Sequence, residues 1–469
     1  MLALRPVRVE PVSLSALAAV AGATPDPAAD VHVTGITHDS RAVQPGDLYA
    51  ALAGAHVHGA AFAGDAVERG AVAVLSDHPI EGTTPTLVVA DPRKVLGAVS
   101  AAVFGEPSRK LAVYGVTGTN GKTTTAYLLE AGLRAAGRTT GLIGTIESHV
   151  AGEVVPSVRT TPEATELQAL LAVMVERGVQ ACAIEVSSHA LALGRVAGTR
   201  FAAALFTNLS QDHLDFHADM EDYFAAKAML FTPAFTDLAV IDVADPWGAR
   251  LADEVRGVEV VRVGADARAR TQLLGDFNER NAALAVAALA ATGIAPDVAA
   301  SGVASLTGVP GRLERIDEGQ DYLAVVDYAH TPAAVTRLLA ALRPLSEGRL
   351  IVVLGCGGDR DAGKRPLMGA AAATGSDVAI LTDDNPRSER SADILAAMLA
   401  GVPVDARDRV AVEPDRARAI ARAVALAQRG DTVVVAGKGH ETGQDVGGVV
   451  TPFDDRDVLR HSIIEAGRP

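Results

Sequence analysis

The sequence is poor in cysteine, in aromatic residues and in basic charge. Its 469 residues include two cysteines, Cys182 and Cys356, which leaves no disulfide framework and is typical of a reducing compartment. Aromatic residues make up 4% of the chain, and the abundance of small aliphatic residues and glycine favours packed α/β layers over a β-sandwich. The net charge of -15 argues against a nucleic-acid partner, because such partners require a basic surface.

Long apolar runs are also missing. No run reaches the roughly 18 residues of a membrane span, so we expect no membrane-spanning segment. Residues 14–23 are apolar and follow two arginines, which is the pattern of a secretory signal peptide. Glu10 and Pro11 interrupt that pattern, and Ser13 suits the cap of a short helix. We therefore interpret the segment as part of the folded protein and expect the protein in the cytoplasm.

One glycine-rich stretch, residues 113–125, organises the rest of the chain. The apolar run 111–116 predicts a buried strand, and residues 124–136 predict a helix that ends at Gly137. Between them lies the sequence GTNGKTT. A strand, a glycine-rich turn and a helix form the layout of a phosphate-binding loop, in which backbone N–H groups and the helix N-terminus hold phosphate oxygens.

The residues of this loop predict a nucleotide site. Lys122 can reach the β- and γ-phosphates, and the Thr123 hydroxyl can bind Mg²⁺. The usual pattern has glycine where this chain has Val116, so the match is imperfect. Gly-Lys-Thr alone is often an ordinary helix start, but the complete strand–turn–helix context favours nucleotide binding.

The length and the order of predicted elements indicate an α/β protein of three domains. Residues 1–108 predict a small α/β domain, and a short polar linker follows. Residues 109–308 predict a central domain whose parallel sheet resembles that of P-loop ATPases. Residues 309–469 repeat strand, loop and helix, which predicts a Rossmann-like, doubly wound sheet.

Polar side chains follow two predicted strands beside the phosphate loop. Glu185 ends the strand 180–186, and His213 lies shortly after the strand 201–207. Ligands bind where parallel strands end, so both side chains are candidate metal ligands, although a capping glutamate and a structural histidine are the alternatives. Lys227 lies in an apolar helical stretch, where a lysine usually extends its amine to water.

Four predicted strands of the third domain end in glycine or charged residues. These strands are 323–326, 350–354, 378–381 and 432–435. Each of the four loops could be a plain turn. Because the carboxyl ends of parallel strands share one edge of a sheet, the four loops together predict a ligand site.

Taken together, these motifs resemble those of the Mur ligases, the ATP-dependent amide-forming enzymes of peptidoglycan synthesis. The resemblance covers nearly the whole chain. It rests on the motifs at 37–41, 118–124, 160–162, 185–189, 208–217, 277–278, 311–312, 327–332, 357–365, 384–387 and 437–441.

The resemblance implies roles for the matching residues. ATP contacts are implied for Gly118, Thr119, Asn120, Gly121, Lys122, Thr123, Thr124, Asn278, Arg312 and Asp327. Contacts to the UDP-muramoyl dipeptide are implied for His38, Ser40, Thr160, Thr161, Ser187 and Arg195. Contacts to the added amino acid are implied for Arg360, Asp384, Asn385, Pro386, Arg387, Gly437 and Glu441. Catalytic roles are implied for Lys122, Glu185, His213 and Lys227, and Mg²⁺ binding for Thr123, Glu185, His213 and Lys227, the last as a carbamate.

The resemblance also implies a reaction. The expected activity is ATP-dependent addition of an amino acid to UDP-N-acetylmuramoyl-L-alanyl-D-glutamate through an acyl phosphate. The expected enzyme is a monomer that binds small-molecule substrates, Mg²⁺ and ATP, and neither nucleic acid nor membrane. Arg387 offers a planar cation for a second carboxylate, which favours meso-diaminopimelate over L-lysine as the added amino acid.

Two other functions compete with this interpretation. A folylpolyglutamate synthetase resembles the same central domain, but that family lacks a separate N-terminal UDP-binding domain. A non-catalytic nucleotide-binding module would not need the whole set of Lys122, Glu185, His213 and Lys227.

The chain departs from the family pattern in two places. Leu193 stands where the family usually has a glutamine, so one polar substrate contact is lost or supplied elsewhere. The stretch 261–274 is also much shorter than expected, because relatives have an additional β-rich segment there.

Overall fold

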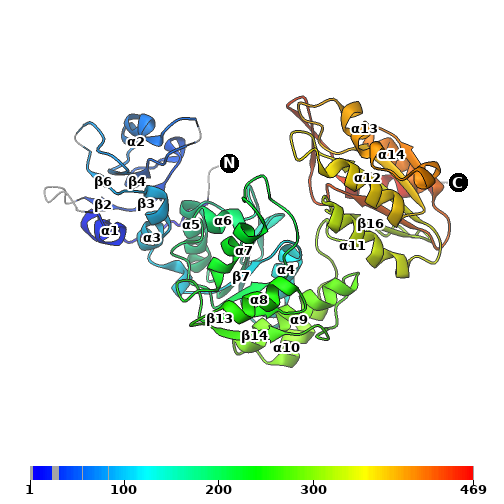
Figure 1. The fold of residues 1–469 in the computed structure, drawn as a ribbon. Helices are drawn as coiled ribbons and strands as arrows, with labels where there is room; N and C mark the ends of the chain where they lie inside the picture. Colours follow the sequence, from blue (N-terminus) through cyan, green and yellow to red (C-terminus); the bar gives the residue numbers. More distant parts are fainter. Residues whose placement is uncertain (1–3, 24–30, 55, 83, 468–469) are drawn as a thin grey trace. The chain divides into compact units, whose positions relative to one another are not determined.

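The computed structural model describes residues 4–23, 31–54, 56–82 and 84–467. The chain forms two compact units, each built from parallel sheets and helices (Figure 1). Unit 1 consists of Met1–Arg270 and Asn281–Ser305, and unit 2 of Thr271–Arg280 and Leu306–Pro469. The predicted α/β class is confirmed. The predicted boundary near residue 108 lies inside unit 1 and stays a prediction.

The first sheet of unit 1 is a four-stranded parallel sheet in the order β3-β4-β5-β6. Its strands are β3 (Gly35–Thr37), β4 (Asp47–Ala50), β5 (Ala73–Ser76) and β6 (Thr86–Val88). Helices α1 (Leu14–Ala21) and α3 (Pro92–Val103) share one hydrophobic cluster with the sheet, and α2 (Ala63–Glu68) shares another. Beside it, β1 (Val12–Ser13) pairs with β2 (His32–Val33).

The segment that resembles a signal peptide is a core helix. The Ser13 hydroxyl accepts a hydrogen bond from the backbone N–H of Ala16 and caps α1, as predicted. Leu14 and Leu17 of this helix are buried. No helix of the described chain is both long and apolar enough to cross a membrane.

The second sheet of unit 1 has eight strands in the order β10-β9-β8-β11-β7-β12-β13-β14. Strands β8 to β14 in this order pair in parallel, and β9 and β10 form an antiparallel hairpin at one edge. The strands are β7 (Ala112–Thr117), β8 (Thr140–Ile143), β9 (Glu147–Val150), β10 (Glu153–Pro156), β11 (Ala181–Glu185), β12 (Ala203–Phe206), β13 (Leu238–Asp242) and β14 (Glu259–Val263). The strand predicted before the phosphate loop is β7, and the strand predicted to carry Glu185 at its end is β11. The two strands are neighbours in the sheet.

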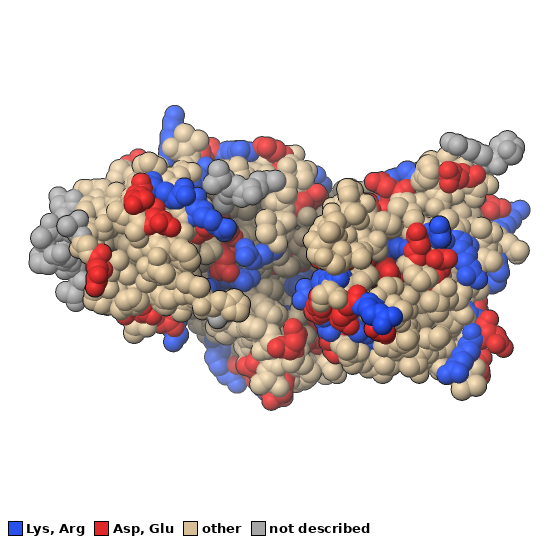
Figure 2. All heavy atoms as spheres, turned by 90° about the horizontal axis from the view of Figure 1, so that it is seen from above, with Lys and Arg blue, Asp and Glu red and all other residues tan. Residues whose placement is uncertain are grey.

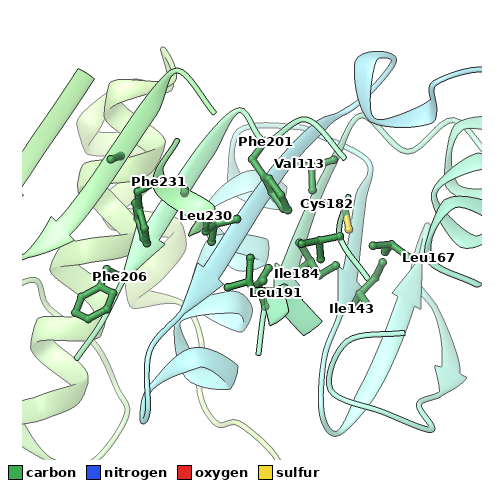
Figure 3. Close-up of a cluster of buried hydrophobic side chains, with 14 of the residues drawn as sticks. Val113, Ile143, Leu167, Cys182, Ile184, Leu191, Phe201, Phe206, Leu230 and Phe231 are labelled. Carbon is green, nitrogen blue, oxygen red and sulfur yellow. The ribbon is translucent and has the colours of Figure 1, made fainter. Parts of the chain in front are cut away.

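Helices pack on this sheet according to the alternation of side chains along its strands. Val113 of β7 faces a large apolar core with Leu167, Leu191 and Phe231 (Figure 3). Tyr114 points to the other face, where its hydroxyl bonds Thr292. The helices are α4 (Lys122–Ala135), α5 (Ala164–Glu176), α6 (Ser188–Ala192), α7 (Met220–Ala228), α8 (Pro246–Glu254), α9 (Asp276–Ala291) and α10 (Pro296–Ala304).

Unit 2 is built on a six-stranded sheet in the order β15-β16-β20-β17-β18-β19. All neighbours are parallel except β15. The strands are β15 (Glu314–Arg315), β16 (Leu323–Asp327), β17 (Leu350–Cys356), β18 (Val378–Asp383), β19 (Val410–Val412) and β20 (Thr432–Ala436). The four strands predicted in this region are confirmed.

Helices cover both faces of this sheet, which confirms the doubly wound arrangement. Helices α11 (Pro332–Leu342), α12 (Lys364–Gly375) and α13 (Ser391–Ala400) share a core with one face of the sheet. Helices α14 (Arg416–Leu426) and α15 (Asp455–Ala466) share a core with the other. A hairpin of β21 (Gly443–Val446) and β22 (Val449–Pro452) follows β20.

The connection from β14 to α9 is short and irregular. Residues 264–275, all of them described, form neither a helix nor a strand. The stretch that the sequence indicates as trimmed therefore contains no β-rich segment. On the face seen in Figure 2, acidic and basic side chains are interspersed, with no broad basic surface.

Candidate active site

The phosphate-binding loop joins β7 to α4, and its geometry requires glycine at two positions. Gly118 has φ +146° and Gly121 has φ +86°, in a region that other residues rarely adopt. A Cβ on Gly118 would come within 1.9 Å of the Thr207 hydroxyl oxygen. The loop can therefore adopt its tight curve only with the GTNG sequence or one much like it.

The loop is held in shape by the end of the neighbouring strand β12. The Thr207 hydroxyl and the Asn208 amide donate to the Asn120 carbonyl at 2.6 and 3.0 Å. The Asn120 N–H donates in return to the Asn208 side-chain oxygen at 3.1 Å. These bonds shape the loop without a ligand, so it is preorganised.

Two lysines converge on one carbonyl of this loop. The Lys122 amine donates to the carbonyls of Gly118 and Thr119, each at 2.8 Å. The Lys227 amine, from α7, donates to the same Gly118 carbonyl at 2.9 Å. Lys227 is 1% exposed and lies over the Tyr223 ring. The expectation that it extends to water is therefore wrong. Burial, together with the charge of Lys122, holds the pKa of Lys227 well below its usual value.

Glu185 lies at the end of β11, directly beside the start of α4. Its carboxylate accepts a hydrogen bond from the Thr123 hydroxyl at 2.9 Å. It also accepts from the N–H and the hydroxyl of Thr145, at 2.7 and 3.0 Å. Thr123 and Glu185, both predicted to hold Mg²⁺, are thus adjacent in a buried setting.

His213 lies in the loop that follows β12. Its backbone has φ +55°, which is unusual for a residue other than glycine. Burial lowers the pKa of His213 to about 4, and the charges of Lys122 and Lys227 act in the same direction. The imidazole is therefore neutral near pH 7, the form in which histidine binds metals.

Three of the residues predicted to contact the UDP substrate lie against Glu185. The Thr161 hydroxyl donates to the Glu185 carbonyl at 2.7 Å and accepts from the Ser187 N–H at 3.1 Å. The Thr160 and Thr145 hydroxyls lie 3.1 Å apart. Thr165, in the first turn of α5, hydrogen-bonds His38, which directly follows β3, at 2.9 Å. The loop after β3 is thus joined to the helix that follows Thr160 and Thr161.

Arg195 is joined to this group through a carboxylate that the sequence did not single out. Its guanidinium pairs with Glu163 at 2.8 Å, and Glu163 also pairs with Arg93 of α3 at 3.3 Å. Ser40 opens the short 3-10 helix Ser40–Ala42, which Asp39 caps. Leu193, the departure from the family pattern, ends α6 and is half-buried. Pairings across 70 residues of sequence, such as Arg93 with Glu163, carry no local signal.

The residues of unit 2 that are predicted to contact ATP have different local surroundings. Asp327 is half-buried at the end of β16, and its two oxygens accept from the N–H groups of Leu313 and Ala329 at 2.8 and 2.7 Å. Burial raises the pKa of Asp327 despite these bonds. The Arg312 guanidinium lies over the Tyr328 ring, 4.4 Å from its centroid. Asn278 lies in the first turn of α9, and its side-chain amide donates to the Leu274 carbonyl at 2.7 Å.

The cations predicted to bind the added amino acid lie where β17 and β18 end. Arg387 has φ +53° and donates to the Gly358 carbonyl at 2.6 Å. A Cβ on Gly357 would lie 3.0 Å from the Arg387 guanidinium and 3.8 Å from Arg360. The two arginines therefore flank one glycine. Glu389 forms two bonds with Arg365, so its carboxylate is engaged away from Arg387.

A buried lysine organises the rest of this edge. Lys438 is 0% exposed and donates to the Asn385 side-chain oxygen at 3.0 Å and to Glu441 at 3.1 Å. The Asn385 amide donates to Glu441 at 2.9 Å. The Asn385 oxygen also accepts the Asp445 N–H, so this oxygen accepts two hydrogen bonds within the protein. Sequence reasoning assigned no role to Lys438, although its motif was recognised.

One cluster of possible metal ligands lies outside these groups. His58 and His78 both approach Asp77, at 3.2 and 2.5 Å. The Nδ1 atom of His58 accepts the Ala60 N–H at 3.1 Å, so the proton of its neutral ring is on Nε2, facing Asp77. This arrangement describes a hydrogen-bonded loop rather than a metal site.

Comparison with known proteins identifies the family. Residues 32–104 match the family model for the catalytic domain of the Mur ligase family. Residues 116–272 match the model for the Mur ligase middle domain, and residues 311–439 match the model for the Mur ligase glutamate ligase domain. The chain belongs to the Mur ligase family. This membership confirms the resemblance seen in the motifs.

Individual Mur ligases and their relatives agree with this assignment. A protein of Streptomyces avermitilis, named UDP-N-acetylmuramoyl-L-alanyl-D-glutamate--2,6-diaminopimelate ligase, is 54% identical over 98% of both chains. A solved structure of a ligase with that same name has a TM-score of 0.69 and 31% identity, and covers 98% of this chain and 100% of its own. A Mycobacterium tuberculosis folylpolyglutamate synthase reaches a TM-score of 0.58 with 21% identity over 73% of this chain and 91% of its own, which shows a common fold only.

The alignment with the Streptomyces protein also bears on the trimmed stretch of the Mur ligase middle domain. It spans 497 positions, more than the 469 residues of this chain. The relative therefore has residues that this chain lacks. The short, irregular connection between β14 and α9 is a suitable place for such a difference.

Proposed function

We propose that this chain is a cytoplasmic, monomeric ligase that uses ATP to join meso-diaminopimelate to UDP-N-acetylmuramoyl-L-alanyl-D-glutamate. The observation that carries this proposal is the match to a ligase of that name over 98% of both chains. The grouping of phosphate-loop, carboxylate and histidine side chains in unit 1 supports it.

The first step is a phosphoryl transfer. A carboxylate oxygen of the D-glutamyl residue attacks the γ-phosphorus, the bond to the bridging oxygen breaks, and ADP leaves with that electron pair. The carboxylate and the triphosphate repel each other, so the step depends on positive charge placed around the phosphates. Lys122 and the N-terminus of α4 supply that charge from this chain, and the preorganised loop fixes the direction of attack.

The second step is an acyl transfer. The amine nitrogen of diaminopimelate attacks the acyl carbon, the carbon–oxygen bond to phosphate breaks, and inorganic phosphate leaves with that pair while the amine loses a proton. The product is an amide. A network such as Thr161, Glu185 and Ser187 would keep the muramoyl peptide oriented through both steps, because its members are fixed by mutual hydrogen bonds.

The residues beside the loop suit Mg²⁺. Thr123 and Glu185 offer a hydroxyl and a carboxylate, the oxygen ligands that Mg²⁺ prefers, and His213 offers a neutral imidazole. Bound Mg²⁺ would neutralise charge on the phosphates. Lys227 fits only as a carbamate, because a protonated amine cannot bind a cation. Its burial and its neutral tendency support that modification, since carbon dioxide reacts with the uncharged amine.

The pair Arg360 and Arg387 supports diaminopimelate over lysine. The two amino acids differ by one carboxylate on the distal carbon. A guanidinium can hold a carboxylate with two parallel bonds, and lysine would leave this group unmatched. Sites built for a polar group reject ligands that lack it by large factors.

The proposal is tested by comparing kcat/KM for the two amino acids. We expect diaminopimelate to exceed lysine by roughly a thousandfold or more, and Arg387→Ala to reduce that ratio by weakening diaminopimelate. Arg390→Ala is the matched control, because Arg390 is an exposed arginine three residues along the same loop, and it should leave the ratio unchanged. Comparable turnover of both amino acids by the unmutated enzyme would overturn the choice of diaminopimelate.

The folylpolyglutamate alternative is weaker on this evidence. That structural match leaves about a quarter of the chain uncovered, whereas residues 32–104 match the Mur ligase family description. Turnover of a folate with glutamate, in place of the UDP-dipeptide, would reverse this preference.

A further inference from the structure

We propose that His217 is a positioning residue that fixes the three segments carrying Glu185, His213 and Lys227. This inference rests on the proposed function, in which those three side chains serve the metal site. Nothing in the motif pattern assigned a role to His217. Its position in the structure gives it contacts with all three segments.

Both ring nitrogens of His217 are used. His217 is 3% exposed, its Nε2 lies 3.0 Å from the Ser188 hydroxyl, and its Nδ1 lies 3.2 Å from the Asp222 carboxylate. Because a carboxylate only accepts, Nδ1 carries a proton, and in the neutral ring Nε2 accepts from the serine. A neutral ring therefore satisfies both partners at once.

These two partners belong to the segments that carry two proposed ligands. Ser188 begins α6, three residues after Glu185, and Asp222 lies in the first turn of α7, the helix that carries Lys227. One imidazole therefore links the end of β11 to α7. Serine, histidine and aspartate in this order also resemble a hydrolytic triad, but Ser188 is 1% exposed, so no substrate reaches its hydroxyl.

The third segment is the loop of His213 itself. The backbone N–H of His217 donates to the His213 carbonyl at 2.9 Å, which closes the turn between them. A left-handed backbone at His213 costs energy and persists only where the surroundings enforce it. The closed turn, anchored at both ring nitrogens of His217, provides that enforcement.

Ring packing completes the arrangement. The His217 ring lies 4.9 Å from that of Phe216 and 5.0 Å from that of Tyr223. The His189 ring lies 4.1 Å from Phe216 and 4.9 Å from His213. The position of the His213 imidazole is thus coupled to His217 through packed rings as well as through the backbone.

The test is His217→Phe, which keeps a flat ring and removes both hydrogen bonds. Groups that orient metal ligands typically change metal affinity about 10- to 100-fold when mutated. We expect the half-saturating Mg²⁺ concentration for ligation to rise by about tenfold or more, with most of kcat recovered at saturating Mg²⁺. Mn²⁺ binding to the enzyme with a non-hydrolysable ATP analogue, measured by electron paramagnetic resonance, should weaken by a similar factor.

A second buried histidine gives the matched control. His149 of the same unit is ion-paired with Glu130, so His149→Phe should lower the melting temperature and leave the Mg²⁺ dependence unchanged. Ser188→Ala removes one bond of His217 with little change in volume, and it should shift the Mg²⁺ dependence in the same direction. It carries the test if His217→Phe does not fold.

The outcomes separate this inference from the proposed function. If His213→Ala raises the Mg²⁺ requirement while His217→Phe and Ser188→Ala do not, the positioning role of His217 is overturned and the metal site stands. If His213→Ala also leaves Mg²⁺ dependence unchanged, the metal-site assignment fails, and this inference fails with it.

Discussion

Each of the two units buries a lysine near the carboxyl ends of its parallel strands, and the two lysines differ in whether a carboxylate lies beside the amine. Lys438 in unit 2 is matched by Glu441 at 3.1 Å and by the Asn385 oxygen. Lys227 in unit 1 donates to the Gly118 carbonyl and lies over an aromatic ring, with no ion pair to a carboxylate among the described residues. Burial and the nearby charge of Lys122 lower the pKa of Lys227 and favour its neutral amine.

This difference separates buried cations that hold the structure together from a buried amine that we propose to be reactive. In unit 2 the deeply buried cations hold loops together, as Arg416 does by pairing with Asp455 at 2.7 Å and donating to the Ala436 and Asp383 carbonyls. A buried pair of this kind contributes mainly by leaving no charge unmatched. In unit 1 an unmatched buried amine remains open to chemistry, and carbamylation is the change that would turn it into a ligand.

The largest effect should come from breaking a structural pair. Asp455→Asn keeps the shape of the side chain but leaves the Arg416 charge unmatched in a fully buried position. We expect a loss of about 3–5 kcal/mol in the stability of unit 2, measured by hydrogen exchange of the β17 and β20 amides. Asp457→Asn, on the exposed face of the same helix, should cost less than about 1 kcal/mol. If Asp455→Asn and Asp457→Asn lowered the stability equally, the distinction between the buried pair and the exposed pair would not hold.

The next effect concerns the reactive lysine. Lys227→Ala should reduce ligation by about a hundredfold or more, with partial recovery in a small carboxylic acid or high bicarbonate, because either could replace the carbamate. Lys94→Ala, which changes an exposed lysine of α3, should not affect the rate. Labelling with ¹³C-bicarbonate should give a carbamate signal in the parent protein and none in Lys227→Ala. Full activity of the parent in carbonate-free buffer would argue against the modification.

A smaller effect is expected from the matched lysine. Lys438→Met retains much of the volume but removes a donor from Glu441 and Asn385. The expected cost is about 1–3 kcal/mol in unfolding free energy, the usual penalty for a buried polar group that loses its partner. Adding Glu441→Gln to this variant should recover part of the lost stability, because the glutamine has no negative charge that requires a cation beside it. A double variant less stable than the single one would contradict the pairing.

The smallest effect is a dependence on pH. Burial of His149 favours its neutral form, but hydrogen bonds to Glu130 and Glu147 outweigh it and raise the pKa of His149 above the usual 6.5. The stabilisation is then fully present below about pH 6.5 and is lost as pH rises through the folded-state pKa. We expect His149→Gln to lower the free energy of unfolding more near pH 6 than near pH 8.5, with a difference of about 1 kcal/mol or less, measured by denaturation at the two pH values. An equal loss at both values would mean that His149 is neutral when folded.

The sequence predicted the elements that depend on local patterns. Apolar runs of four to seven residues located β7, β11, β16, β17 and β20, because strands buried on both faces show continuous hydrophobicity. The glycines of the phosphate loop and the cap at Ser13 follow from conformational preferences of single residues. The strand ends then indicated which polar side chains share one edge of a sheet.

Only the tertiary structure decided how those side chains are paired. Sequence reasoning gave extension to water as the usual position of a lysine such as Lys227, and it assigned nothing to Lys438 or His217. Each of these depends on groups brought together from distant parts of the chain, such as Gly118 with Lys227 across 109 residues. The local sequence determines which backbone conformations each residue can adopt without strain. Whether a buried charge is compensated depends on how deeply it is buried and on which group lies next to it. Burial and neighbours are set only when the sheets and helices pack together.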